Sequence, residues 1–170
     1  MFIINRKKYF QQVYFKVTEK YIDALKNIEN ILMRNGAANY IDEDYITVMT
    51  STFLFCLYHV EGALQHKYWP KYKTETSAIL ETIMQTMCKS IEIDYNKTYN
   101  TYFNIRTKIG EMCLDNEQTK SYNPTFLTAT LFLITAFDNK YHPEELGYGV
   151  GSVESDIARV FRKLMYDCLE

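Results

Sequence analysis

The chain has 170 residues, of which 47 % are hydrophobic and 15 % aromatic, and its formal net charge is −2. This length and composition predict one folded domain over residues 1–170 with a single core, and they exclude a disordered chain. The small acidic charge excludes the strongly basic surface typical of nucleic-acid-binding proteins, so nucleic acid is an unlikely partner.

Targeting signals and disulfide patterns are missing from the sequence. The start, MFIINRKKYF, lacks the long apolar segment of a signal peptide, and the longest apolar run, residues 126–137, is too short to cross a bilayer. The four cysteines lie far apart and form no CxxC pair, which indicates free thiols in a reducing compartment. We therefore expect a cytoplasmic protein without a membrane partner.

The first predicted helix runs from about Arg6 to Arg34. Its apolar residues alternate steps of four and three along one helical face. They are Phe10, Tyr14, Val17, Tyr21, Ala24, Ile28 and Ile31. Gly36 is suited to the left-handed residue that closes a helix. We expect this seam to pack within the molecule, but it could also form a homodimer through helix 1. A protein that sediments as a monomer at high concentration would contradict the homodimer.

The next two predicted helices have clear boundaries. Asp42 can cap the second helix, which the Trp69–Pro70 pair ends. A third helix begins in KTETS, residues 73–77, where a threonine can cap. Both continue with apolar residues at helical spacing.

The middle of the chain is less regular. Residues 94–113 fit a helix by period, although their asparagines and threonines are poor helix formers, and IEIDY before them could be a short strand. A polar loop is expected over residues 114–123, after which Pro124 opens a fifth helix. That helix is apolar nearly all round, so we expect it to be central.

A glycine-rich stretch, ELGYGVGSVESD over residues 145–156, precedes the sixth predicted helix. Its GxGxG spacing, the absence of a lysine and four acidic neighbours argue against a phosphate-binding loop. The free backbone N–H groups at the helix start can be satisfied by Ser152 as the cap. The six helices together predict an all-α, single-domain bundle.

No catalytic or metal-binding motif is present. His59 and His66 lie two helical turns apart, and no HExxH or ExxH pattern occurs, so no metal is expected. No GxSxG motif occurs, and the cysteines lie on apolar helix faces. We therefore assign no catalytic residue and no cofactor.

Aromatic and acidic residues near turns are the best candidates for a partner-binding surface, because aromatic side chains bury a large area at low entropic cost. The predicted partner-binding residues are Glu144, Glu145, Tyr148, Glu154, Asp156, Trp69 and Tyr72. The sequence favours a non-enzymatic protein-binding module, in its narrowest form a small inhibitor or immunity-type protein that blocks a partner protein. Two alternatives stay open: an enzyme with a pocket inside the bundle, and a helical nucleic-acid-binding regulator.

Overall fold

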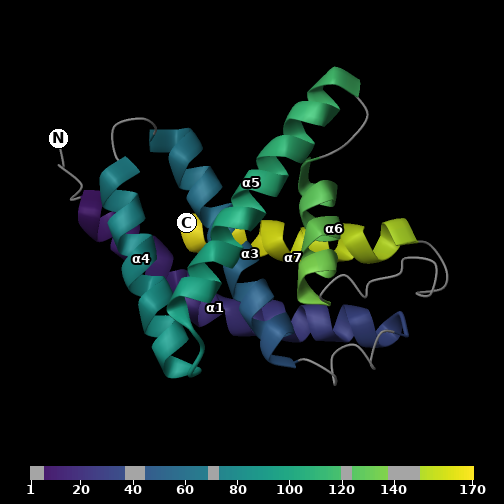
Figure 1. The fold of residues 1–170 in the computed structure, drawn as a ribbon, viewed down its shortest axis with the longest axis horizontal. Coiled ribbons are helices and arrows are strands. Elements are labelled where there is room, and N and C mark those ends of the chain that lie inside the picture. The colour runs from purple at the N-terminus through teal and green to yellow at the C-terminus, as the bar shows by residue number, and fades with distance from the viewer. Residues whose placement is uncertain (1–5, 37–44, 69–72, 120–123, 138–149) are drawn as a thin grey trace.

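The computed structural model describes residues 6–36, 45–68, 73–119, 124–137 and 150–170. Over these ranges it consists of helices and turns, which confirms the all-α bundle of six helices (Figure 1). The helices are α1 (Arg6–Arg34), α3 (Tyr45–Tyr68), α4 (Lys73–Ser90), α5 (Tyr95–Thr119), α6 (Pro124–Ala136) and α7 (Val150–Leu169). None of them is both long and apolar enough to cross a membrane.

The central helix of the bundle is α3, which packs against all five of the others. The expectation that the helix opened by Pro124 is central was wrong, because α6 packs only against α3, α5 and α7 among the described elements. Figure 1 shows α5 crossing α3, with α4 on one side of this crossing and α6 on the other. The buried side chains form one hydrophobic core that draws on all six helices.

The apolar seam of α1 packs inside the molecule, as expected. Phe10, Tyr14, Val17 and Ile28 are fully buried, and α1 lies against α7, α3 and α4. The hydroxyl of Tyr9 donates a hydrogen bond to the carbonyl oxygen of Leu169 at 3.3 Å, so the start of α1 lies beside the end of α7. Homodimerisation through helix 1 stays a prediction, and it would have to use the outer face of α1.

The helix boundaries confirm some expectations and correct others. Gly36 has a φ of 78° beyond the end of α1, as its type predicted. The IEIDY segment forms a turn instead of a strand, with Glu92 at a φ of 57°. Helix α5 continues to Thr119 through residues predicted as a loop. Helix α7 begins at Val150, so Ser152 lies inside its first turn and is not the residue before the helix.

A cluster of aromatic rings lies in the core between α3, α6 and α7. The ring of Phe161 stacks on Phe55 with centroids 5.9 Å apart and meets Phe132 edge-on at 5.3 Å. Phe55 also meets Phe132 edge-on at 5.4 Å. Each of these side chains is fully buried, so the cluster fixes three helices relative to one another.

Three of the four cysteines are free and buried in this core, as the sequence predicted. They are Cys56, Cys88 and Cys168. Burial raises the pKa of the Cys56 thiol well above its ordinary value, and burial also raises that of Cys168 to about 11. Thiols with raised pKa values are poor nucleophiles at neutral pH, and the side chain of Cys113 lies outside the described residues.

Replacing Phe161 with alanine tests this account of the core. We expect the free energy of unfolding to fall by about 3–5 kcal/mol, because the substitution leaves a cavity among rigid rings. Phe15→Ala is the matched control, since Phe15 is 61 % exposed on α1 and should change the free energy by less than about 0.5 kcal/mol. Equal losses in urea titrations of the two variants would contradict this description of the core.

Candidate functional site

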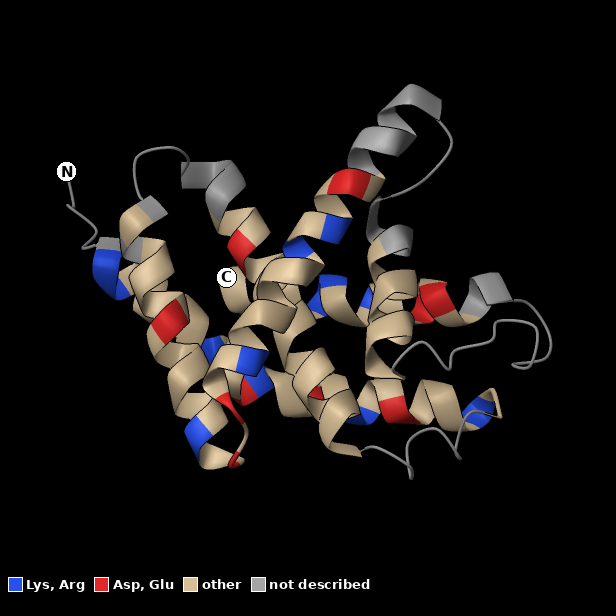
Figure 2. Cartoon of the chain, viewed as in Figure 1, with Lys and Arg blue, Asp and Glu red and all other residues tan. Residues whose placement is uncertain are grey.

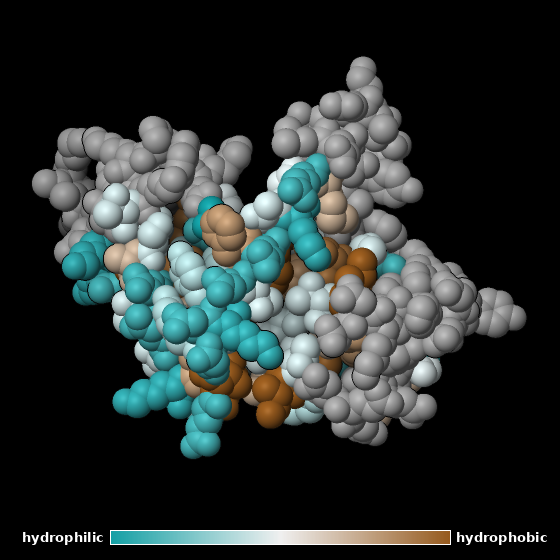
Figure 3. Space-filling model, in the orientation of Figure 1, coloured by the Kyte–Doolittle hydropathy of each residue, from teal (hydrophilic) through white to brown (hydrophobic). Residues whose placement is uncertain are grey.

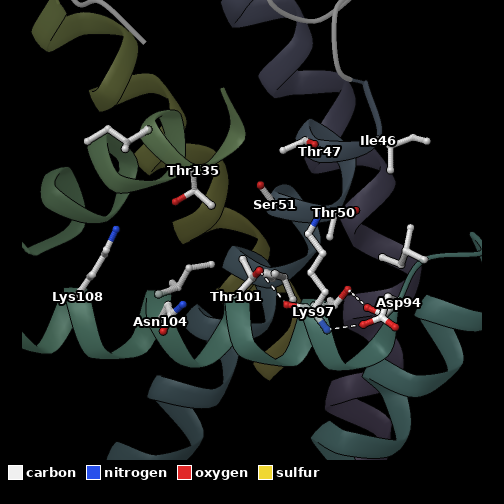
Figure 4. A pocket seen from close by; sticks show the side chains of 15 residues that line it. Ile46, Thr47, Thr50, Ser51, Asp94, Lys97, Thr101, Asn104, Lys108 and Thr135 are labelled. Carbon is white, nitrogen blue, oxygen red and sulfur yellow. Dashed lines mark hydrogen bonds between the residues drawn. The ribbon is translucent and has the colours of Figure 1, made fainter. Parts of the chain in front are cut away.

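A cleft of about 440 Å³ lies between α3, α5 and α6 (Figure 4). Pockets that bind small ligands or short segments typically span about 300–1,000 Å³. Its lining is rich in hydroxyl groups, which come from all three helices. They belong to Thr47, Thr50, Ser51, Thr98, Thr101 and Thr135.

Three of these hydroxyls point their hydrogen atoms at their own helix. Thr98 donates to the carbonyl oxygen of Asp94 at 2.8 Å, and Thr101 donates to that of Lys97 at 2.9 Å. On α6, Thr135 donates to the carbonyl oxygen of Leu131 at 2.8 Å. A hydroxyl has one hydrogen and two lone pairs. These three groups therefore offer acceptors to anything that enters the cleft.

The α3 wall of the cleft differs, because two of its hydroxyls are not committed in this way. Neither Thr50 nor Ser51 forms a hydrogen bond with another described residue. Ser51 is only 3 % exposed, and Figure 4 shows its side chain beside the cleft. The Thr50 and Ser51 hydroxyls can therefore donate a hydrogen bond to a polar ligand in the cleft.

The charges of the cleft are uneven, with two lysines and one aspartate. Lys97 extends from α5 toward Thr50 and Ser51, and Lys108 extends from α5 toward α6 (Figure 4). The carboxylate of Asp94 already accepts the backbone N–H of Lys97 at 2.6 Å, as the cap of α5. The positive charge of the lysines is therefore the charge that a ligand would meet.

The cleft has an apolar floor. Leu54 of α3 and Ile105 of α5 are buried there, and Ile134 of α6 is partly buried. On this face of the molecule, Figure 3 shows pale and brown side chains between hydrophilic teal ones. The combination of apolar contact with polar groups that fix orientation is typical of binding sites.

A buried polar network lies where α5 contacts α3 beyond the cleft. Glu61 of α3 is 2 % exposed and accepts hydrogen bonds from the hydroxyl of Tyr102 and from the guanidinium of Arg106, the latter at 3.2 Å. The side chain of Arg106 is 39 % exposed, so the network reaches the surface at this residue. The network joins α3 to α5 by a charged pair and a hydrogen bond.

Two buried tyrosines, Tyr102 of this network and Tyr14 of α1, are held neutral. Burial, followed by the negative charge of Glu61, raises the pKa of Tyr102 and the pKa of Tyr14 well above the ordinary tyrosine value. The Tyr14 hydroxyl is buried and has no hydrogen-bond partner among the described residues. Neutral phenols beside a paired carboxylate stabilise that carboxylate, and they lack the acidity needed for proton transfer near neutral pH.

The environment of His59 does not resemble a catalytic base. Its ring stacks on Phe161 with centroids 5.3 Å apart, and its Nε2 atom is buried without a hydrogen-bond partner in the described part of the chain. Burial, followed by the positive charge of Arg162, lowers the pKa of His59 to about 4. An enzyme with a pocket inside the bundle would gain support from a histidine beside a carboxylate or thiol in a polar cavity, and His59 instead lies among aromatic rings. The side chain of His66 lies outside the described residues.

Two of the predicted partner-binding residues lie on α7, and they occupy different environments. Glu154 is 2 % exposed, so its side chain lies in the interior and not on the surface where we expected it. In the sequence, Glu154 directly follows Val153 and lies one helical turn before Ile157. Both of these residues are buried in the core, which explains the burial of Glu154. Asp156 is partly exposed and its carboxylate accepts a hydrogen bond from Arg159 at 3.0 Å.

The other predicted partner-binding residues lie outside the described ranges. They are Glu144, Glu145, Tyr148, Trp69 and Tyr72. Figure 2 shows the positions of basic and acidic residues interspersed along the helices that are described. The structure thus draws attention to the cleft, which sequence reasoning had not identified.

Within the described ranges, no group of three histidine, cysteine or acidic side chains is placed to hold a metal ion. The cleft has hydroxyl, lysine and apolar groups, which suit an organic ligand better than a metal. Comparison of the chain with models of known families, with curated proteins and with solved structures found no match.

The buried histidine predicts a pH dependence of stability. The pKa of His59 is about 4 in the folded chain, against an ordinary value of 6.5, so the unfolded chain binds the proton more tightly. Its contribution to stability is complete above pH 6.5 and is lost as the pH falls toward 4. The loss amounts to roughly 3 kcal/mol, at 1.36 kcal/mol per pH unit.

His59→Phe is the variant that isolates this effect, because phenylalanine keeps the stacked ring and removes the titrating nitrogen. Urea unfolding at pH 7 and pH 4.5 should show a smaller loss of stability for the variant than for the wild type. Carboxylates titrate equally in both proteins and cancel in the comparison. Identical losses would show that His59 is protonated in the folded chain.

Proposed function

We propose that this chain is a non-enzymatic protein-binding module, and that the cleft between α3, α5 and α6 holds a segment of the partner protein. The observation that supports this most directly is the lining of the cleft. It combines an apolar floor, hydroxyl acceptors and two lysines, and its described residues include no histidine or cysteine. These groups can bind and orient a ligand, and neither Thr50 nor Ser51 forms a hydrogen bond with the amine of Lys97 that would pair a hydroxyl nucleophile with a base.

The narrower form of the proposal is an inhibitor or immunity-type protein that blocks the partner's active site. Its support is the acidic and aromatic composition of residues 144–148, which could imitate an anionic substrate. In this form, adding the chain to the captured partner would lower that partner's enzymatic activity. An adaptor would leave the activity unchanged.

Blocking the cleft tests the proposal. Thr101 is partly buried in the cleft, and Thr101→Trp should fill much of the space between the helices. We expect the wild-type chain to capture a partner from native lysate, and the variant to lose at least about tenfold of the captured amount as measured by quantitative mass spectrometry. A tenfold loss corresponds to about 1.4 kcal/mol of binding free energy.

Thr86→Trp is the matched control for this experiment. Thr86 donates the same kind of hydrogen bond to the carbonyl four residues earlier, at 2.8 Å, but it is exposed on α4 away from the cleft. Both variants should show cooperative thermal unfolding. Equal capture by folded Thr101→Trp and Thr86→Trp proteins would refute the cleft as the partner site.

A further inference from the structure

We infer that the segment held in the cleft is an extended, acidic stretch of chain with two carboxylate side chains four or six residues apart. This inference rests on the proposed function and adds the chemistry of the partner. It follows from the spacing of the two lysines on α5, from the acceptors on the cleft walls and from the shape of the floor.

The lysine spacing sets the spacing of the acidic groups. Lys97 and Lys108 are eleven positions apart, and three helical turns bring them to nearly the same face of α5. At about 1.5 Å per residue, their backbone positions are separated by roughly 16 Å along the axis. An extended chain covers about 3.3 Å per residue and alternates its side chains, so acidic groups four or six residues apart point the same way and span roughly that distance.

The two lysines extend to different parts of the cleft, Lys97 toward Thr50 and Ser51 and Lys108 toward α6, so they present two separate positive groups (Figure 4). Both lysines line the cleft and both are exposed, so each can reach a carboxylate of a bound segment. Asp94 directly precedes α5, and its carboxylate accepts the backbone N–H of Lys97 as the helix cap. Because the negative charge of Asp94 repels acidic side chains, the first acidic group of the segment lies on the Lys108 side of Asp94.

The hydroxyls favour an extended backbone between the two acidic groups. Thr98, Thr101 and Thr135 present acceptors, because their hydrogens are bound to helix carbonyls. An extended segment presents unpaired backbone N–H donors, which these acceptors can satisfy. The uncommitted hydroxyl of Ser51 can donate to a backbone carbonyl of the same segment.

The floor completes the match to an extended segment. Side chains of an extended chain alternate between two faces, so one face can lie on Leu54 and Ile105 while the other points to solvent. A segment with acidic side chains at its two ends and small apolar side chains between them would use every part of the cleft. The chemistry of the cleft thus identifies a class of partner segment, not a sequence.

The test is a selection of peptides against the intact chain. A phage library of random twelve-residue peptides is selected against the wild type, against a Lys97→Glu, Lys108→Glu double variant and against a Lys26→Glu, Lys89→Glu control. The control replaces two exposed lysines of α1 and α4 and changes the net charge equally. The best peptides are then synthesised and titrated by fluorescence anisotropy.

We expect the wild type and the control to enrich peptides with two acidic residues four or six positions apart. The double variant should bind those peptides about tenfold more weakly, and it should enrich peptides with basic residues at the same spacing. Raising the salt from about 0.05 to 0.5 M should weaken wild-type binding, because exposed ion pairs are screened. A reversed preference can arise only in a folded variant.

Each contrary result has a separate meaning. Enriched peptides that lack the acidic pair but are lost on Thr101→Trp substitution would overturn this inference and leave the proposed function standing. Enriched peptides that bind Thr101→Trp as well as the wild type would overturn the proposed function. A library without any enriched peptide would overturn both.

Discussion

The buried carboxylate of Glu61 is the interaction on which the position of α5 depends. It lies on the central helix and accepts hydrogen bonds from Tyr102 and Arg106, one turn apart on α5. Removing one partner from a buried ion pair costs about 3–5 kcal/mol, and the partial exposure of Arg106 lowers that cost here. An ionic pair among apolar side chains is satisfied in few arrangements, so it specifies how α5 crosses α3 as well as stabilising the crossing.

The cleft is a consequence of this crossing. Residues of α5 that face Glu61 and residues that face the cleft lie on different sides of the helix, with Ile105 between them in the core. Tyr102 and Arg106 hold α5 against Glu61 of α3, and the cleft is lined by α5 residues both before and after them, from Lys97 to Lys108. Helix α6 forms the third wall, and it is held in place by the aromatic cluster around Phe161. A rigid cleft loses little conformational entropy when a segment binds.

Much of the fold could be predicted from the sequence, because it depends on local patterns. The heptad seam of α1, the glycine that follows it and the proline that opens α6 all have local physical causes, and each was confirmed. The errors have physical causes too. Residues 115–119 are all polar and show no apolar period, yet they continue α5 to Thr119. The glycines before Ser152 suggested a break, whereas α7 already begins at Val150.

The candidate site could not be predicted from local patterns, although two features of the sequence agree with it once the structure is known. Glu61 is the only acidic residue in α3, and an isolated acid in an apolar helix indicates a buried partner. Lys97, Thr101, Asn104 and Lys108 share one face of α5, but their types indicated only a weak helix. The topology of the bundle brings hydroxyls from three helices to one cleft. The periodicity of residues along a single helix carries no information about that topology.

The most direct test of the cleft as the binding site is a methyl NMR titration of the intact chain, with threonine methyl groups labelled with carbon-13 and a selected peptide or the captured partner added. The account predicts chemical-shift changes at Thr50, Thr101 and Thr135, which line the cleft. It predicts none at Thr82 and Thr86, which are exposed on α4. Binding that shifts the α4 methyl groups and leaves the cleft threonines unchanged would contradict it.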